Sequence, residues 1–513
     1  MSGKYRRVLV SMLIIALMTV LTIPTSAFGV KAASEVGPQV AYLAPDKYEP
    51  DDTFEEAYVY DPAMDGNTFY SRRTFDGANE VVDNNSDFIA ITVEDTGTPI
   101  WVETMMVQGD WDTYVYMYDE SQTQVVWADD NDWWDSTYSE SVYYVAPEPG
   151  TYYVEIQNRN MMAEYDLFIT VGDARRVSGD NRYETAAEIS RLMWDQVSSR
   201  YWGSGQGPQH IVVANGKNPA DALAGGSLAA QLGGIMLLTE SDYLPKETRA
   251  EIVRVTEALY WGDYTVTVWV LGGSNAVSEA VFDDIAGIRN VDVVNRISGA
   301  TRYDTAAEIA NTMATEVGVG TTAYIVNGAA WADALAVGPV AAYNSAPVLL
   351  TAASDVPSAT LDWLDLNGVT NVVVVGGTGV VSAEAYAELE ASYTATRVAG
   401  DTRYDTAKEV ALWGVNNLFM DGSLATLASG ANFPDALCAA PISWWTEGPI
   451  LLTEPTALSP AVGEYFAENG SIGHPYTSAW SYEGIGCYVI GGTGAISETV
   501  FEEFRDLWMG IIE

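Results

Sequence analysis

The 513-residue chain is poor in the residues that most often mark redox or metal chemistry. Its two cysteines, Cys438 and Cys487, are too few for a disulfide framework. Its two histidines, His210 and His474, leave little room for a histidine-based zinc site or catalytic triad. One cysteine follows a predicted helix start and the other begins a predicted strand, so we expect two buried thiols too far apart to bond.

Basic residues are also scarce, with 24 Lys plus Arg against 70 Asp plus Glu and a formal net charge of −46. This balance excludes a general binder of nucleic acid or of anionic membranes. It fits a secreted protein that stays soluble in salty or calcium-containing surroundings. Almost half of the residues are hydrophobic, so a chain of this length can form about four domains, each with its own core.

Residues 1–33 have the pattern of a signal peptide, which predicts a secreted protein at the cell wall or cell surface. Lys4, Arg6 and Arg7 precede a long apolar run, and small residues suited to cleavage follow it. The run is slightly long for a signal, so a retained membrane anchor is the alternative. No other segment has the length and apolar character of a membrane span, and we expect no membrane contact in the mature form.

Residues 42–172 are rich in Tyr, Trp and Asp and alternate as strands do. The segments 114–118, 141–145 and 151–156 have the β-branched and aromatic bias of a sheet. A Pro-Glu-Pro-Gly turn at 147–150 separates the last two segments. This region therefore predicts an N-terminal all-β sandwich.

Three motifs in this region resemble the bacterial pre-peptidase C-terminal domain family: YEPDDTFEEA at 48–57, DTYVYMYD at 112–119 and GTYYV at 150–154. The resemblance implies an accessory module, usually found beside secreted enzymes, that does no chemistry itself. A surface protein or a glycan is the partner to expect for such a module.

One loop of the same region crowds carboxylates together. Oxygen ligands of this kind suit calcium, so the loop is a candidate calcium site, although a solvated acidic loop is the alternative. The candidate metal ligands are Asp129, Asp130, Asp132 and Asp135.

A 14-residue stretch occurs three times in the rest of the chain. It reads RVSGDNRYETAAEI from Arg176, RISGATRYDTAAEI from Arg296 and RVAGDTRYDTAKEV from Arg397. Repeats at domain-sized spacing predict homologous domains. We place these domains at residues 175–295, 296–396 and 397–513.

Each copy alternates apolar strands with helices. In the second copy, strands are expected at 323–327, 346–351 and 371–377, and Ser382 is expected to cap the helix that follows. This order predicts an α/β fold with a parallel sheet and right-handed crossovers. The Gly-Gly turns after the Val-rich strands lack the lysine of a phosphate-binding loop, so we interpret them as tight turns.

These patterns together resemble the cell wall binding repeat 2 family. The pattern elements are RxxGxxRYxTA, Gly-x4-Asp-Ala-Leu, a Leu-Leu strand and a Val-rich strand ending in Gly-Gly. The resemblance implies three domains in a pseudo-threefold arrangement, non-covalent attachment to a wall of the Gram-positive type, and an anionic wall polymer as partner. The family's Ile-Leu-Leu anchoring motif corresponds here to positions 236–238, 348–350 and 450–452. Its candidate ligand-binding residues are Leu237, Leu238, Leu349, Leu350, Leu451 and Leu452, and burial in a core strand is the alternative.

The repeated stretch itself predicts a helix start. Asn181, Thr301 and Thr402 occupy the N-cap position, and an acidic residue follows three positions later, as in a capping box. An arginine then lies in the first helical turn, where a cation opposes the helix dipole. This placement predicts an acidic partner, which is either a neighbouring aspartate or an anionic ligand. The arginines are Arg182, Arg302 and Arg403.

We expect the repeats to concentrate arginines at one anionic-polymer site, because the guanidinium fork suits phosphate and carboxylate groups. The remaining arginines of the motif are Arg176, Arg296 and Arg397. Asp221, Asp333 and Asp435 recur at predicted helix starts, where N-capping is one role and pairing with the arginines is another.

The sequence thus predicts a secreted surface protein that is held on the wall by three repeats and displays a β-sandwich. A structural surface-layer component is the alternative function. A wall-associated hydrolase is less favoured, because no segment is left for a catalytic domain and no carboxylate pair of a glycosidase stands out. We therefore expect no enzymatic activity and no cofactor other than calcium.

Overall fold

The computed structural model describes most of the chain beyond residue 52, within the unit that spans Ala44–Glu513. The described residues are 53–54, 57–60, 68–74, 86–93, 98–108, 113–128, 141–158, 164–171, 174–200, 209–219, 222–260, 265–422, 424–469 and 487–508. The predicted signal peptide and the acidic loop at 129–135 lie outside them. Among the helices in these ranges, we find none with the length and apolar character needed to cross a membrane.

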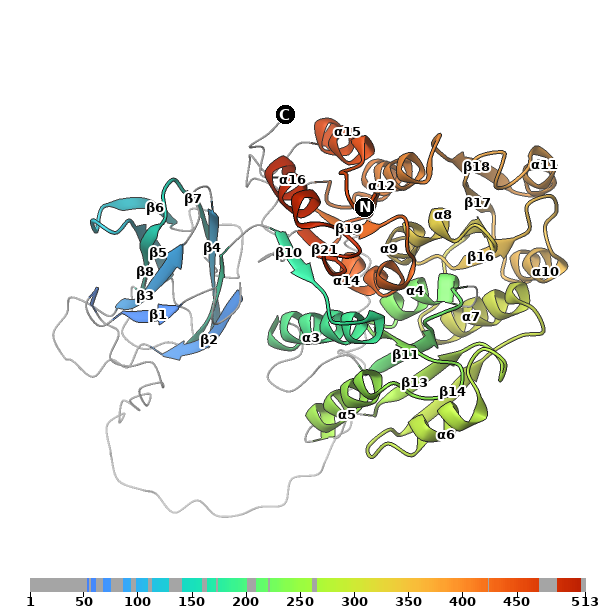
Figure 1. Cartoon of the computed structure of the whole chain (residues 1–513), viewed down its shortest axis with the longest axis horizontal. Helices are drawn as coiled ribbons and strands as arrows, with labels where there is room; N and C mark the ends of the chain where they lie inside the picture. Colours follow the sequence, from blue (N-terminus) through green and yellow to red (C-terminus); the bar gives the residue numbers. More distant parts are fainter. Residues whose placement is uncertain are drawn as a thin grey trace, which may run out of the picture. The chain divides into compact units, whose positions relative to one another are not determined.

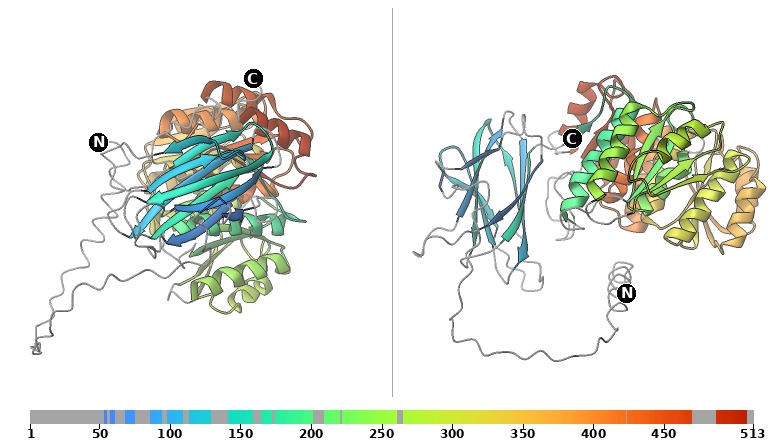
Figure 2. Two further views of the ribbon diagram at one scale, coloured as in Figure 1. Left: turned by 90° about the vertical axis from the view of Figure 1, so that its left-hand side faces the viewer. Right: turned by 90° about the horizontal axis from the view of Figure 1, so that it is seen from below.

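The first described region consists of two β-sheets that share one hydrophobic core (Figures 1 and 2). The first sheet has the order β1-β3-β8-β5-β6, with bounds Tyr58–Tyr60, Ser86–Val93, Gly150–Asn158, Thr113–Tyr118 and Gln124–Ala128. The second sheet has the order β2-β9-β4-β7, with bounds Thr68–Thr74, Glu164–Val171, Thr98–Gln108 and Ser141–Ala146. All described strand pairs are antiparallel except β1 with β3.

Alternation along the strands produces this architecture. Val154 and Ile156 of the first sheet and Leu167 and Ile169 of the second belong to one cluster of fully buried side chains. Because successive strand residues point to opposite faces, their neighbours lie on the outer faces. The predicted all-β sandwich is confirmed.

The second described region contains the three repeats, whose elements recur in the same order. The first copy comprises β10 (Ala174–Val177), α3 (Arg182–Arg200), β11 (His210–Asn215), α4 (Ala222–Gln231), β12 (Ile235–Thr239), α5 (Lys246–Tyr260), β13 (Thr267–Leu271) and α6 (Glu279–Ala286). The second comprises β14 (Val293–Ile297), α7 (Arg302–Glu316), β15 (Thr322–Asn327), α8 (Trp331–Leu335), α9 (Val337–Tyr343), β16 (Val348–Thr351), α10 (Ser358–Leu366), β17 (Asn371–Val375) and α11 (Ala383–Glu390). The third comprises β18 (Thr394–Val398), α12 (Arg403–Leu418), β19 (Ala425–Ser429), α13 (Pro434–Leu437), α14 (Ala439–Trp445), β20 (Ile450–Thr453), α15 (Pro460–Asn469), β21 (Cys487–Ile490) and α16 (Glu498–Trp508).

Each repeat contributes to a four-stranded parallel sheet, as predicted. The strand orders are β12-β11-β13-β14, β16-β15-β17-β18 and β20-β19-β21-β10. The fourth strand of each sheet therefore comes from the opening motif of the next copy. The third sheet is completed by β10 of the first copy, which pairs with β21 from Ala174–Cys487 to Val177–Ile490.

The helices follow the same cyclic pattern (Figure 1). The opening helix of each copy packs on its own sheet and also contacts the short helices of the preceding copy: α7 on α4, α12 on α8 and α9, and α3 on α13 and α14. The three sheets are thus joined at three equivalent junctions, each made by one opening motif. We call these junctions 1/2, 2/3 and 3/1 after the copies that they join.

Small residues allow the copies to pack closely at the centre. Helices α4, α9 and α14 contact one another pairwise. A Cβ atom added at Gly226 would lie 3.0 Å from the Ala440 side chain, and one added at Gly338 would lie 2.8 Å from it. Equivalent helices that meet pairwise give the expected pseudo-threefold arrangement.

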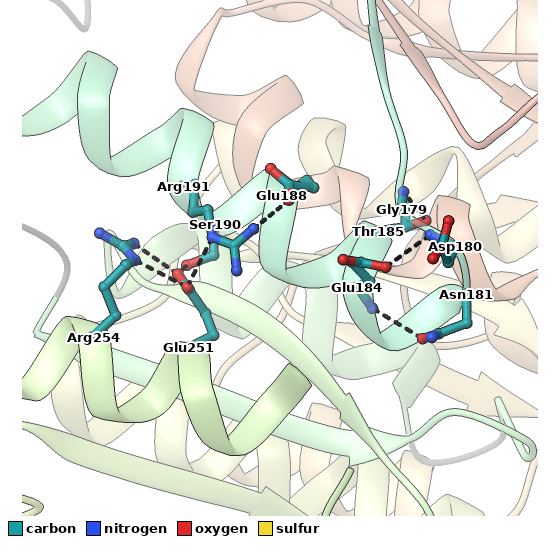
Figure 3. A network of polar contacts seen from close by, with 10 residues as sticks. All are labelled: Gly179, Asp180, Asn181, Glu184, Thr185, Glu188, Ser190, Arg191, Glu251 and Arg254. Carbon is teal, nitrogen blue, oxygen red and sulfur yellow. Dashed lines mark hydrogen bonds and ion pairs between the residues drawn. The ribbon is translucent and has the colours of Figure 1, made fainter. Parts of the chain in front are cut away.

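The helix starts also agree with the sequence. Thr301 and Thr402 each form a full capping box with the aspartate three residues later. In the first copy, Asn181 accepts from the backbone N–H of Glu184 at 3.1 Å, and the Glu184 carboxylate accepts from the N–H of Asp180 (Figure 3). Ser278 and Ser382 cap the helices after the Gly-Gly turns.

Both cysteines are buried and neither forms a disulfide, as expected. Cys438 follows α13 and Cys487 begins β21. Burial raises the pKa of the Cys438 thiol, and the nearby Asp435 acts in the same direction. Cys438 is therefore a protonated core residue at neutral pH.

Candidate ligand-binding site at the domain junctions

The first arginine of each motif clamps the junction from within. Arg176 donates from Nη1 to the carbonyls of Gly491 and Ile496, both at 2.9 Å, and from Nη2 to Ser497 at 3.3 Å. Its guanidinium lies 4.9 Å from the centre of the Phe501 ring. All of these acceptors belong to the third copy, so Arg176 of the first copy ties the two together.

The equivalent arginines repeat this arrangement. Arg296 donates to Gly272 at 2.9 Å and Val277 at 2.8 Å, and Arg397 donates to Gly376 at 2.6 Å and Ser382 at 3.3 Å. Each lies over an aromatic ring of the preceding copy, Phe282 for Arg296 and Tyr386 for Arg397.

The surroundings of these three arginines indicate a structural role. The side chains of Arg176 and Arg296 are only 16% and 17% exposed, and their donors are directed to backbone carbonyls and, at 3.3 Å, to the carboxylates of Glu498 and Glu279. Partial burial also lowers the pKa of Arg397. The first arginines, at 176, 296 and 397, therefore hold the junctions together, and a polymer contact by them stays a prediction.

The second arginine of each motif is placed differently. Arg182, Arg302 and Arg403 donate from Nη1 to the carbonyls of Gly216, Gly328 and Gly430 at 2.5, 2.5 and 2.7 Å. Each of these glycines follows the first central strand of the arginine's own copy. Arg403 is exposed, whereas Arg182 and Arg302 are partly exposed. These three guanidinium groups are therefore accessible to a ligand at the junctions.

The acidic partner that the sequence demands comes from the preceding copy. Asp333 of the second copy interacts with Arg403 of the third, and Asp435 of the third copy interacts with Arg182 of the first. Burial raises the pKa of both carboxyl groups, and the arginine acts in the opposite direction in each. Each arginine therefore acts electrostatically on the aspartate at junctions 2/3 and 3/1, although no ion pair of 4 Å or less joins them among the described residues. Asp221, the equivalent residue of the first copy, lies outside the described residues.

The N-cap role expected for these aspartates is wrong where the structure describes them. The N-cap of α8 is Ala330 and that of α13 is Phe433, and neither makes a side-chain capping bond. Asp333 lies three residues after its N-cap and Asp435 two residues after its N-cap, so both are inside the helix. They are oriented toward the junction instead, where each carboxylate meets the Gly-Gly turn of its own copy.

Two separate constraints require glycine at the first position of this turn. Gly376 and Gly491 adopt φ angles of 111° and 114°, which side chains rarely tolerate. A Cβ atom there would also lie 3.1 Å from Asp333 Oδ2 and 2.9 Å from Asp435 Oδ2. The tight-turn interpretation is confirmed, and the turn doubles as one wall of the junction.

The three junctions differ in their aromatic content. At junction 2/3, the Arg403 guanidinium lies 5.4 Å from the centre of the Trp331 ring, which packs edge-on against Phe433 at 5.7 Å. Pro219 occupies the position of Trp331 in the first copy. The second arginines thus belong to three different junctions, and among the residues that the structure describes, junction 2/3 combines an exposed arginine with a tryptophan.

The six leucines of the anchoring motif need a correction as well. All are at most 1% exposed: Leu237, Leu238, Leu349, Leu350, Leu451 and Leu452. They lie on β12, β16 and β20, the sheet strands that the helices cover. A side chain with no exposed surface cannot contact a polymer, so the alternative reading as core strand holds.

A buried carboxylate that sequence reasoning missed fixes the opening helix of the first copy (Figure 3). Glu251 of α5 is fully buried and accepts from Ser190 of α3 at 2.5 Å and from Arg254 at 2.9 and 2.6 Å. Arg191 of α3 also pairs with it at 3.5 Å. A glutamate at a helical apolar position was the available signal. This network positions the helix that carries Arg182.

No group of three or more potential metal-binding side chains occurs among the described residues. The candidate calcium loop, with Asp129, Asp130, Asp132 and Asp135, falls outside them. Its affinity for calcium stays a prediction.

Comparison with known proteins agrees with this architecture. The Cell wall binding domain 2 (CWB2) family matches residues 176–282, 296–386 and 397–501, which together are more than half of the chain. The chain belongs to this family. The bacterial pre-peptidase C-terminal domain matches residues 85–158, in the β-sandwich.

The similar proteins include an enzyme and two proteins of known structure. The chain is 33% identical over 285 residues to the N-acetylmuramoyl-L-alanine amidase LytC of Bacillus subtilis, a match that covers 56% of this chain and 51% of the relative. Cwp6 from Clostridium difficile is 20% identical with a TM-score of 0.54, covering 82% of this chain and 66% of that one. Cwp8 from the same organism is 25% identical with a TM-score of 0.53, covering 66% and 52%. The chain thus spans about half the length of the LytC amidase that it resembles.

Proposed function

We propose that the protein is secreted and held non-covalently on the cell wall by its three CWB2 repeats, which bind an anionic wall polymer at the domain junctions. Membership of the CWB2 family supports the wall as the target. The junction arginines support an anionic ligand. The β-sandwich is then displayed at the cell surface.

The observation that carries this proposal is the state of Arg403. It is exposed, and among the described residues one hydrogen bond is found for its fork, from Nη1 to Gly430. A guanidinium group has five N–H donors in a planar array that matches a phosphate or carboxylate. Trp331 beneath it adds an apolar surface for a sugar ring beside the anionic group.

An acidic protein that binds an acidic polymer needs local compensation. Arg403 and Arg182 act electrostatically on Asp333 and Asp435, and burial favours the neutral form of both carboxyl groups. A neutral aspartate would leave the arginine's charge available to the ligand. Calcium bridging, with the acidic loop as one source of ligands, would provide further compensation.

The test is retention of the full-length protein on purified walls, before and after their secondary polymers are stripped, with and without calcium. The variant is R182Q/R302Q/R403Q. The matched control removes three basic charges of the repeats outside the repeated motif, K246Q/R249Q/R505Q. Thermal unfolding checks that both variants are folded.

We expect the wild-type protein and the control to bind intact walls and to lose binding when the polymer is stripped. The junction variant should bind at least tenfold more weakly, since a hydrogen bond to a charged group contributes about 1.5–3 kcal/mol. A folded junction variant that binds intact walls as tightly as the control would refute the role of the arginines.

The similarity to LytC amidase favours one second candidate, a wall-associated hydrolase. The match spans 285 residues, which is comparable to the length of the three repeats. It therefore does not assign the amidase activity in the relative's name to this chain. Release of free amino groups from purified peptidoglycan by the full-length protein would support this candidate. A structural role in a surface layer would instead require ordered assembly of the purified protein.

A further inference from the structure

One pair of aromatic rings connects two of the three junctions. Trp331 and Phe433 occupy equivalent positions, each two residues before the junction aspartate of its copy. Their rings meet edge-on, with centres 5.7 Å apart. Trp331 lies beside Arg403 at junction 2/3, and Phe433 precedes Asp435, on which Arg182 acts at junction 3/1. We call Trp331 and Phe433 the aromatic pair.

The packing of the short helices explains why these two rings meet. Trp331 is the first residue of α8, and Phe433 directly precedes α13. Helix α4 contacts both α8 and α13. Each of these helices follows the first central strand of its copy, so the loops before them come together at the carboxyl ends of the three parallel sheets. Ligands of α/β proteins commonly bind at this end of a sheet.

The fold does not require a large aromatic residue at this position. Pro219 is the equivalent residue of the first copy, and it is partly exposed, as Trp331 and Phe433 are. Both rings border the central hydrophobic core and keep part of their surface exposed. Because the first copy forms the same elements with a proline here, the aromatic surface at the other two copies is available for a second role.

Guanidinium groups lie at both junctions that the aromatic pair connects. Arg403 is exposed, and its guanidinium lies 5.4 Å from the centre of the Trp331 ring. Arg182 is partly exposed and belongs to the junction of Phe433. A ligand that covers the two rings therefore has a positive charge beside it at junction 2/3 and another at junction 3/1.

Two glutamates close to these arginines leave that charge available. Glu240 accepts a hydrogen bond from Tyr183 at 2.7 Å and pairs with Lys217 at 2.8 Å, so a further cation offsets its charge. Glu454 occupies the corresponding position of the third copy and is exposed. Water and salt therefore screen its charge.

We propose that junctions 2/3 and 3/1 form one continuous binding surface for a charged glycan, with sugar rings on the aromatic pair and a phosphate or carboxylate group on Arg403. The apolar face of a pyranose ring packs on an aromatic ring, and the guanidinium fork binds the anionic group beside it. The inference rests on the proposed function and narrows its ligand. The polymer must combine sugar rings with anionic groups, and charge alone does not suffice.

The three junctions are then unequal in what they recognise. Junction 1/2 offers Arg302 beside Pro219 and binds the charge of the polymer without a ring for its sugar. Junctions 2/3 and 3/1 recognise both parts of the repeating unit. Three homologous copies thus produce one principal binding surface.

The test titrates the full-length protein with two soluble probes. One is the secondary polymer released from purified walls of the source organism, and the other is inorganic polyphosphate, which carries charge but no sugar. The variants are W331A, W331F and R403Q. The matched control is F419A, which removes an 83% exposed ring from the C-cap of α12, at the opposite end of that helix from Arg403.

We expect wild-type protein to bind the wall polymer at least tenfold more tightly than polyphosphate. W331A should lose about tenfold or more in affinity for the wall polymer and keep its affinity for polyphosphate. W331F, which retains a flat ring, should bind nearly as wild type does. R403Q should bind both probes more weakly, and F419A should behave as wild type.

A further variant separates loss of the ring from loss of stability. Trp331 borders the core, so W331A should unfold at a lower temperature than wild type. W331L keeps most of the apolar volume without a flat ring, and its thermal unfolding should be closer to that of wild type. It should show the same selective loss of affinity for the wall polymer.

Two results would overturn the role of the aromatic pair. One is a folded W331L variant that binds the wall polymer as tightly as wild type does. The other is an equal loss of affinity for both probes in W331L and W331A, which would mean that Trp331 only positions Arg403. With either result, weaker wall retention of R182Q/R302Q/R403Q would leave the proposed function standing. Wild-type protein that binds neither intact walls nor the released polymer would refute the proposed function and this inference together.

Discussion

Junction 2/3 and junction 3/1 are built from the same parts but are closed in different ways. At junction 2/3, β18 follows α11 after residues 391–393 and pairs with β17 of the copy just completed. At junction 3/1, β10 pairs with β21, which lies about three hundred residues further along the chain. The strand that completes the sheet is therefore close in sequence to its partner at junction 2/3 and distant in sequence from its partner at junction 3/1.

The boundaries of the repeating unit in the sequence therefore do not coincide with those of the folding unit in the structure. Each sheet is completed by a strand of the next copy, so a copy cut at its motif lacks its own fourth strand. Two junctions are supported by chain connectivity. The third depends on side-chain and backbone contacts alone, and those contacts are correspondingly numerous at Arg176.

The largest difference between the two junctions is expected when a charge is placed at equivalent core positions of their closing strands, β10 and β18. Val177 and Val398 are 5% and 6% exposed, and V177D and V398D should each cost more than about 4 kcal/mol, as an unpaired buried charge does. Because β10 can leave its sheet without moving a flanking element of the third copy, V177D should also open one segment selectively. Thermal unfolding and limited proteolysis measure the two effects.

V177D should be cleaved around residues 174–181 while the rest of the repeats resists, whereas V398D should lose resistance throughout the second and third copies. Identical cleavage patterns in the two variants would contradict the idea that junction 3/1 is the one that opens on its own.

A milder comparison removes the arginine clamps. R176A and R397A each remove donors from backbone carbonyls at a partly buried site, and we expect each to lower the free energy of unfolding by about 2–4 kcal/mol. R176A should be the more damaging, since Arg176 donates to Gly491, Ile496 and Ser497, whereas Arg397 donates to Gly376 and Ser382. Urea unfolding of both variants decides the order, and a larger loss for R397A would be the contrary outcome.

The smallest expected change in stability comes from replacing the buried aspartates, and its size depends on pH. Burial raises the pKa of Asp333 in the folded protein, against the opposing influence of Arg403 and Thr406. A carboxyl group with a raised folded pKa contributes most stability when protonated, and that contribution falls as pH rises from the unfolded pKa through the folded one. D333N should therefore raise the unfolding temperature slightly at neutral pH and flatten its rise toward acid.

Asp435 provides the matched case at junction 3/1, where burial raises the pKa and Arg182 opposes it. D435N should change stability in the same direction as D333N. Destabilisation of both variants at neutral pH would show that the charge of the arginine outweighs burial.

Local features of the repeats could be predicted from the sequence because short-range chemistry determines them. The capping residues Thr301 and Thr402, the glycine turn at Gly376 and the buried leucine strands all follow from residue type and spacing. An acidic residue within electrostatic reach of Arg403 and of Arg182 is also present. In each case the interacting residues are adjacent in sequence, or the need for a partner is set by the residue itself.

What could not be predicted is which elements meet across the chain. The pairing of β10 with β21 leaves no local signature, since a parallel strand looks the same whichever neighbour it joins. The two arginine sets therefore looked alike, although Arg176 is directed to a Gly-Gly turn and Arg403 is exposed. Asp333 was misread as a cap for the same reason, because its real contacts belong to a turn and a helix elsewhere in the chain.

The cyclic exchange of strands makes the order of the copies along the chain arbitrary for the fold. If residues 508 and 174 were joined by a linker and the repeats were reopened at 391–393, every strand would keep its present partners. The circularly permuted repeats would then have junction 2/3 as the one closed without a covalent link. The ends of the repeat region could therefore lie at a different junction while the folded arrangement stays the same.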